Sequence, residues 1–86
     1  MVLKTVKETE TILAALGKRI RHLRRERGFN LLDFANQCNL DETSISNIEA
    51  GKVNVSYSTM LRISETLNVD VNDLSNGLPS TSFSIY

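Results

Sequence analysis

The stretch from Asn30 to Gly51 constrains the fold of this chain more than any other, because two short apolar stripes flank a set of turn-forming residues. The first helix is predicted to begin at Asn30 or the residue after it. Asn39 is predicted to end this helix, since asparagine tolerates the left-handed conformation that reverses the chain. The apolar stripe of this helix repeats at the spacing of one helix face and consists of Phe34, Ala35 and Cys38.

A second short helix is predicted to follow Asp41 and to end at Gly51. The carboxylate of Asp41 is suited to accept the free backbone N–H groups of the first turn. Ile45 and Ile48 supply the buried face. At about 100° per residue, the opposite face carries the small or polar residues Thr43, Ser46, Asn47 and Ala50. Glu42 lies at the flank of this face, at the leading end of the helix.

Two interpretations of that polar face are open. Most polar helix faces are simply solvated, and this helix alone favours that interpretation. The alternative is base reading, because asparagine can bond adenine, glutamate can accept from the cytosine amino group, and threonine can contact the thymine methyl group.

The formal net charge is zero, but the charges are divided along the sequence. Residues 1–28 hold eight basic and three acidic residues, a net +5, whereas residues 29–86 hold two basic and seven acidic residues, a net −5. A basic cluster precedes the two-helix unit and consists of Lys18, Arg19, Arg21, Arg24, Arg25 and Arg27. In an arbitrary soluble protein such a cluster is a solvated face. Beside two helices arranged to meet DNA, it indicates a phosphate-contacting surface.

The segments LGKRIRHLRRERG before this unit and GKVNVSYSTMLRISETLNVDVNDL after it extend the pattern. From Leu16 to Leu74 the chain resembles the Xre/Cro-like helix-turn-helix family of transcriptional regulators, which have a phage-repressor-like DNA-binding domain. The linked positions that carry the resemblance are Ile20, Leu23, Arg24, Gly28, Phe34, Ala35, Leu40, Ile45, Ser46, Ile48, Glu49, Gly51, Leu61, Ile63, Leu67, Val69 and Leu74.

The resemblance implies an all-α fold, a compact five-helix domain whose helix-turn-helix offers its second helix to the major groove. It implies a sequence-specific transcriptional regulator, a repressor or an activator, that binds double-stranded DNA as a homodimer on two half-sites. The implied base contacts are Glu42, Thr43, Ser46 and Asn47, and the implied backbone contacts are Arg19, Lys52 and Asn54. It also implies a largely buried ion pair between Arg24 and Glu49. The dimer interface is expected to comprise Leu67, Val69, Val71, Leu74 and Leu78.

Three departures from the family pattern lead to further expectations. Asn39 and Asn68 stand where the family usually has glycine, so both are predicted to adopt a positive φ. Leu31 occupies a position from which the family often contacts phosphate through glutamine, so that contact is expected to be missing. Asp41 and Glu42 place negative charge at the leading end of the second helix, which favours selective over sequence-independent binding.

The chain, at 86 residues, has room for one small domain. We expect a helical N-terminal extension at residues 1–15, the helix-turn-helix domain at 16–75 and a C-terminal tail at 76–86. The extension is either part of one long first helix or a separate helix that ends near Gly17. A fourth helix is predicted after Ser56, with an inward face of Met60, Leu61, Ser64 and Leu67.

The tail is rich in turn formers and serine, but its last seven residues, STSFSIY, alternate with the two-residue period of a strand. A disordered tail is the default interpretation. We expect instead that it docks on its own dimer or is ordered by a protein partner. The second alternative describes an antitoxin or another partner-binding protein, which would use the head for autoregulation and the tail for the partner.

The sequence lacks the patterns expected of an enzyme or a metal site. His22 lies among arginines without ligands at a suitable spacing and is interpreted as solvated. The single cysteine, Cys38, is predicted to be a buried thiol. We therefore expect no catalytic residues, no cofactor and no metal. Because the sequence has no bilayer-length apolar run and no secretion signal, we expect a cytoplasmic protein without a membrane partner.

Overall fold

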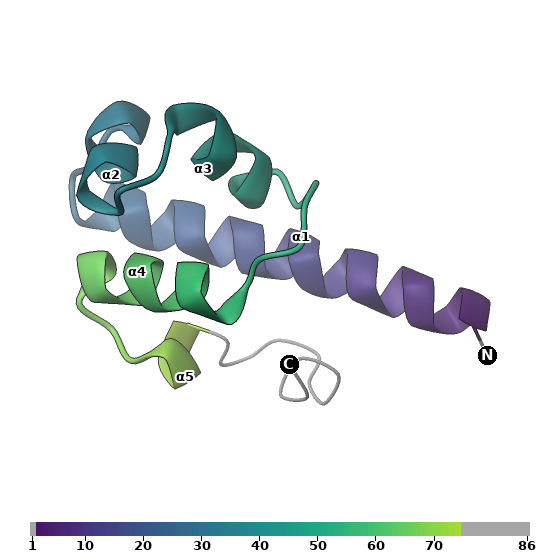
Figure 1. Cartoon of the computed structure of the whole chain (residues 1–86). Helices are drawn as coiled ribbons and strands as arrows, with labels where there is room; N and C mark the ends of the chain where they lie inside the picture. The colour runs from purple at the N-terminus through teal and green to yellow at the C-terminus, as the bar shows by residue number, and fades with distance from the viewer. Residues whose placement is uncertain (1, 75–86) are drawn as a thin grey trace.

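The computed structural model describes residues 2–74, with side chains described from residue 12 onward. Within that part of the chain every regular element is a helix, as predicted, and the fold has five of them (Figure 1). They are α1 (Val2–Glu26), α2 (Leu31–Gln37), α3 (Glu42–Glu49), α4 (Tyr57–Leu67) and α5 (Val71–Leu74). In the view of Figure 1, α2 and α3 lie above α1, and α4 and α5 lie below it.

Helix α1 is unbroken from Val2 to Glu26, so no separate leading helix ends at Gly17. At about 1.5 Å per residue, its 25 residues make it the longest element of the described chain. Its N-terminal half extends beyond the other helices, and its C-terminal half packs against them (Figure 1). The boundary expected after residue 15 therefore falls inside a continuous helix.

Helix α2 and the turn after it follow the predicted chemistry. The Asn30 side chain accepts a hydrogen bond from the Asp33 backbone N–H at 2.8 Å, so Asn30 is the N-cap. Asn39 has a φ of 58° and directs the chain toward α3, and the Leu40 N–H closes the turn on the Ala35 carbonyl at 2.9 Å. The sequence predicted that this helix begins at Asn30 or the next residue and that Asn39 ends it, because both features depend on a few neighbouring residues.

The hydrophobic core lies between α1 and the other four helices. Its members are Leu16, Ile20, Leu23, Phe34, Ala35, Cys38, Ile45, Ile48, Met60, Ile63, Leu67 and Leu74. Because each fully buried aliphatic side chain contributes about 1.5 to 3 kcal/mol, a core this small depends on most of its members. Cys38 is buried as predicted, and burial raises the pKa of its thiol, with a hydrogen bond to Thr66 opposing the rise.

Helix α4 starts at the predicted cap, where the Ser56 hydroxyl accepts the Thr59 N–H at 3.2 Å. It ends at Asn68, whose φ of 59° confirms the second predicted left-handed asparagine. The prediction of Leu61 as an inward residue is wrong, because Leu61 is 37% exposed and Ile63 is buried instead. The buried set follows a strict helical spacing and consists of Met60, Ile63, Ser64 and Leu67.

Two residues expected in the dimer interface are buried inside their own protomer. Leu67 and Leu74 are both 0% exposed and fill the core of their own protomer, so they have no surface left for a second copy. Val69 and Val71 are half-buried against the same core. Leu78 and the tail lie outside the described residues. None of the described helices is both long and apolar enough to cross a membrane.

Candidate nucleic-acid interface

Helix α3 presents a polar outer face. Ile45 and Ile48 are 0% and 5% exposed and hold the helix on the core. Glu42, Thr43 and Ser46 are exposed, and Asn47 is half-buried. The residues predicted to read bases thus lie on the side of α3 that the core leaves uncovered.

The leading end of α3 differs from its prediction in one respect. Asp41 is the N-cap residue, but its carboxylate makes no capping bond to a backbone N–H. It accepts the hydroxyl proton of Ser44 instead, and this hydrogen bond lowers the pKa of Asp41. The carboxylate is therefore ionised at neutral pH, and a fixed negative charge stands beside Glu42.

A hollow of about 280 Å³ lies between α3, the following loop and the start of α4. Its polar lining consists of Ser44, Asn47, Asn54, Ser56 and Thr59. Asn47 and Asn54, which were predicted to contact bases and backbone respectively, thus share one concave surface. Their amide groups supply donors and acceptors at the edge of the α3 face.

The loop after α3 begins at Gly51, whose φ is 73°. A Cβ added there would lie 2.9 Å from the Ala14 Cα atom of α1, so the loop requires glycine both for its conformation and for its contact with α1. The Lys52 N–H then bonds the Asn47 carbonyl at 3.0 Å. Lys52 and Asn54 are exposed immediately beyond this anchored turn.

Arg24 and Glu49 join α1 to the C-terminal end of α3. Arg24 Nε lies 2.6 Å from Glu49 Oε2, and Arg24 Nη2 lies 3.1 Å from Glu49 Oε1, which makes the pair bidentate. The two side chains are 9% and 8% exposed, and Arg24 Nη1 also donates to the Phe29 carbonyl at 3.0 Å. The structure thus brings together the two residues expected to form an internal ion pair.

The same end of α3 rests on Gly17 of α1. A Cβ at Gly17 would lie 2.6 Å from the Ile48 carbonyl oxygen and closer still to that of Glu49. The sequence suggested that Gly17 could end a helix. In the structure, the absence of a side chain at Gly17 allows the α3 backbone to pack directly against α1. The signal for this role was the run of small residues at positions 14, 15 and 17, in the middle of α1.

The basic cluster of α1 does not form one surface. Arg19 Nε donates to the Asp73 carbonyl of α5 at 3.2 Å, and Arg27 Nε donates to the Leu67 carbonyl at 2.6 Å. Through its Nε, Arg19 links α1 to α5, and its expected contact with the DNA backbone stays a prediction. Lys18, Arg21 and Arg25 are exposed.

Titratable groups that could hold a metal do not gather in the described part of the chain. His22 is exposed, as predicted, and its Nε2 lies 3.4 Å from Glu26 Oε2. A histidine and a single carboxylate do not complete a coordination shell for zinc.

A family model described as "Helix-turn-helix domain" matches residues 17–77. The HTH-type transcriptional regulator DdrOP3 of Deinococcus deserti is 35% identical over 63 residues, which are 73% of this chain and 49% of that protein. This chain thus spans about half the length of that curated relative.

Two solved structures are similar in fold. The restriction-modification controller protein C.AhdI from Aeromonas hydrophila has a TM-score of 0.73 and 28% identity, covering 76% of this chain and 94% of that chain. The clp gene regulator ClgR from Corynebacterium glutamicum has a TM-score of 0.70 and 25% identity, covering 73% of this chain and 67% of that chain.

Proposed function

The chain belongs to the helix-turn-helix domain family, and on this basis we propose that it is a sequence-specific DNA-binding regulator of transcription. Its relatives include an HTH-type transcriptional regulator, so the resemblance noted in the sequence is confirmed. The three relatives described above are regulators or controllers and not enzymes, in agreement with the prediction that this chain is not an enzyme.

The observation that carries the proposal is the uncovered polar face of a short helix that is held on the rest of the domain. Ile45 and Ile48 are buried in the core, and Glu49 bonds Arg24 of α1. A rigid helix of eight residues can enter the major groove with its side chains already ordered. We propose that Thr43 and Asn47 contact base edges, with Glu42 and Ser46 beside them.

The loop after α3 supplies the proposed backbone contacts. Lys52 and Asn54 are exposed beyond the turn at Gly51 and next to the hollow that Asn47 lines. A lysine and an amide at this place can bond phosphate oxygens and set the position of α3 in the groove. Replacing Lys52 with glutamine would weaken binding to all sequences alike and lower the salt dependence.

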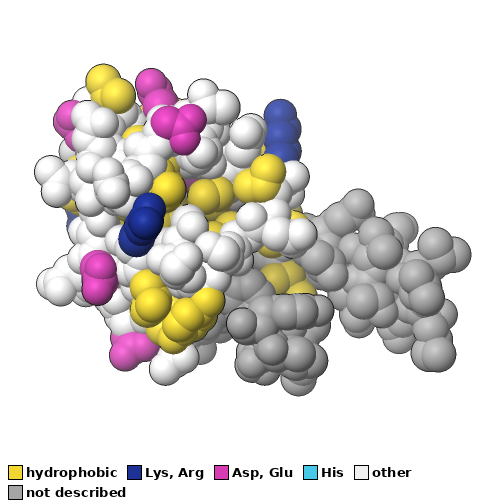
Figure 2. All heavy atoms as spheres, viewed as in Figure 1, with side chains coloured by type: hydrophobic (Ala, Val, Ile, Leu, Met, Phe, Trp, Pro, Cys, Tyr) yellow, Lys and Arg dark blue, Asp and Glu magenta, His cyan; other side chains and the backbone are white. Residues whose placement is uncertain are grey.

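We propose that the regulator acts as a homodimer, because one helix-turn-helix reads only a few base pairs. Tyr57 and Leu61 of α4 are 57% and 37% exposed, and Val69 and Val71 near α5 are half-buried. Figure 2 shows hydrophobic side chains gathered over α4 and α5 on the face it presents. These four residues replace Leu67 and Leu74 as the proposed contact between two copies.

Selection of bound duplexes from a random pool tests the proposal. The expected result is enrichment of one sequence with two related half-sites, centred about one helical turn apart. A pool without any enriched sequence after repeated rounds would refute sequence-specific binding. Enrichment of one unrepeated half-site would support base reading and contradict the dimer.

A further inference from the structure

Six cations, five on the second half of α1 and Arg27 directly after it, divide into two groups of three. Arg19 and Arg27 bond backbone carbonyls of their own protomer, and Arg24 is paired with Glu49. Within the described chain, Lys18, Arg21 and Arg25 are exposed and form no hydrogen bond or ion pair. We call these last three residues the α1 stripe.

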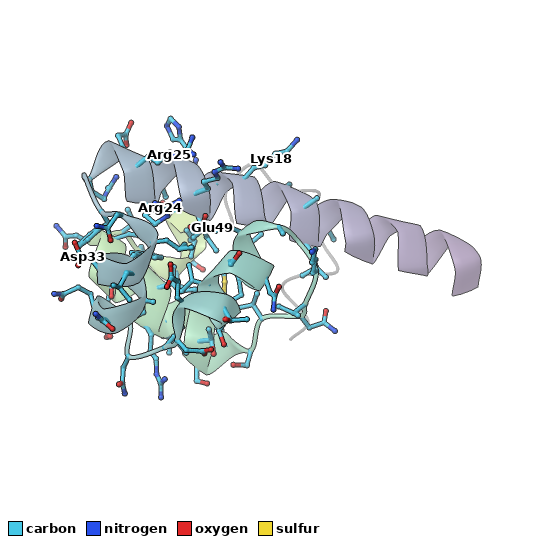
Figure 3. The ribbon with its side chains drawn as sticks, turned by 90° about the horizontal axis from the view of Figure 1, so that it is seen from above. Lys18, Arg24, Arg25, Asp33 and Glu49 are labelled. Atoms are coloured by element: carbon cyan, nitrogen blue, oxygen red, sulfur yellow. The ribbon has the colours of Figure 1, made fainter. Side chains whose placement is uncertain are left out.

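The α1 stripe follows one line along the helix. Its residues are spaced at i, i+3 and i+7, which places them within a narrow arc at about 100° per residue. In Figure 3 the side chains of Lys18 and Arg25 point away from the Arg24–Glu49 pair. The three charges therefore stand on a rigid helix, separate from the cations that hold the fold together.

The arrangement is unfavourable for an isolated helix. Like charges three or four residues apart destabilise a helix by about 0.2 to 0.5 kcal/mol per pair. The nearest acidic residue along α1 is Glu26, which already contacts His22 at 3.4 Å and Arg27 at 3.1 Å. A partner that supplies several negative charges at once would relieve this repulsion.

The surface around α3, which is proposed to face DNA, has few cations to neutralise phosphates. Between Leu31 and Val55 the only basic residue is Lys52, whereas Asp33, Asp41 and Glu42 are acidic and exposed. A domain that binds duplex DNA gains affinity by neutralising phosphates. Around α3 the described surface offers Lys52 and, at the turn before α3, Arg62, whose Nη1 donates to the Asn39 carbonyl at 3.4 Å. Most of the other cations of the described chain lie on α1 or directly after it.

The α1 stripe begins where α3 touches α1. Gly17, against which the Ile48 carbonyl packs, directly precedes Lys18 and lies one helical turn before Arg21. The stripe is therefore continuous with the end of the proposed reading helix. A duplex that contacts α3 and continues along this flank of α1 would present its phosphates to the stripe, which is the reason to prefer a nucleic acid over an acidic protein.

We propose that Lys18, Arg21 and Arg25 bind phosphates of the duplex that flanks the bases read by α3. This inference rests on the proposed DNA-binding function and identifies the source of most of its electrostatic affinity. The contact extends the footprint of each protomer beyond its half-site. It carries no sequence information, because phosphates are the same at every base pair.

The test compares the full chain with a triple variant, Lys18→Gln, Arg21→Gln and Arg25→Gln. Glutamine is nearly as good a helix former as lysine or arginine, so the fold is retained, which circular dichroism and thermal unfolding check. Binding to the selected sequence and to a random duplex is measured over a series of salt concentrations. Arg62→Gln is the control, because Arg62 is an exposed cation of α4 whose Nη1 donates to the Asn39 carbonyl at 3.4 Å; the same unfolding measurements check that its loss leaves the fold intact.

The proposal predicts that the triple variant binds both duplexes more weakly by similar factors. The slope of log K against log salt should fall by up to about 2.7 per protomer, since each phosphate contact contributes about 0.9. Arg62→Gln should change neither slope nor affinity appreciably. The stretch of DNA that the protein protects from nuclease cleavage should also become shorter at both ends of the selected site.

Other outcomes separate the failure of this inference from the failure of the proposed function. Specific binding with an unchanged slope in the triple variant would overturn the stripe proposal alone. The parent chain could instead bind all duplexes equally, and the triple variant could lose this binding. That result would support the stripe and overturn sequence-specific regulation. A chain that binds no duplex at low salt would overturn both.

Discussion

Gly17 of α1 and Ile48 of α3 approach so closely that a Cβ added at Gly17 would lie 2.6 Å from the Ile48 carbonyl oxygen. The bidentate pair of Arg24 and Glu49 lies one to two turns further along α1. Together these two contacts seat the C-terminal end of α3 on α1. They fix the orientation of the helix that is proposed to enter the groove.

Replacing Gly17 with alanine should destabilise the domain, although alanine is the better helix former by about 1 kcal/mol. The added methyl group meets backbone oxygens that cannot rotate away, so we expect a net loss of about 1 to 3 kcal/mol in the free energy of unfolding. Urea denaturation measures this loss, and Lys18→Ala at the next, exposed position is the control, expected within about 0.5 kcal/mol. A Gly17→Ala protein as stable as the parent would contradict the close contact.

Removing either partner of the Arg24–Glu49 pair should cost about 3 kcal/mol or more, because the remaining charge is left buried and unpaired. Arg24→Met and Glu49→Leu test this singly, and the double variant should recover part of the loss because neither charge then remains. Chemical denaturation of the three variants gives the coupling energy. Losses under about 0.5 kcal/mol for both single variants would show that the pair is no stronger than a surface contact.

Leu61→Ser should weaken the proposed homodimer. In a two-fold interface the change occurs twice, and the loss of two partly buried leucines raises the dissociation constant by about 100-fold. Sedimentation over a concentration series measures it. Leu32→Ser on α2, where the parent side chain is 53% exposed, is the control and should leave the association unchanged. If the parent chain sediments as a monomer at micromolar concentration, the dimer proposal is wrong.

Burial raises the pKa of Cys38, which leads to a pH dependence of stability. In the unfolded chain the thiol ionises above about pH 8.5, while the folded protein keeps it protonated. The unfolded state therefore releases a proton, and the free energy of unfolding should decrease as the pH rises through this range. Urea titrations at several alkaline pH values should show a smaller decrease for Cys38→Ala. An identical pH dependence in both proteins would contradict the raised pKa.

The sequence predicted the turns and most helix starts, because each is decided within a few residues. The exception is Asp41, whose carboxylate accepts from Ser44 and not from a backbone N–H. Asn30, Asn39, Ser56 and Asn68 have the expected roles, since each depends on a side chain next to the backbone it bonds or on a left-handed conformation. The Arg24–Glu49 contact followed from the resemblance, because two residues 25 positions apart cannot be paired from spacing alone.

Spacing could not predict the direction in which a side chain points after the helices pack. Arg19 and Lys18 are neighbours in one basic run, but only Arg19 bonds α5. Leu74 is apolar in a short helix, and spacing could not tell whether its own core or a second copy covers it. Gly17 shows the same limit, because the need for glycine comes from the backbone of a distant helix.

The central claim is that Asn47 on α3 reads a base, and the effect of Asn47→Ala on the selected duplex and on a scrambled duplex of equal length tests it most directly. The account predicts that binding to the selected duplex weakens by about 1 to 3 kcal/mol, that preference is lost at one base pair, and that binding to the scrambled duplex and the salt slope stay unchanged. Equal weakening on both duplexes would contradict the claim.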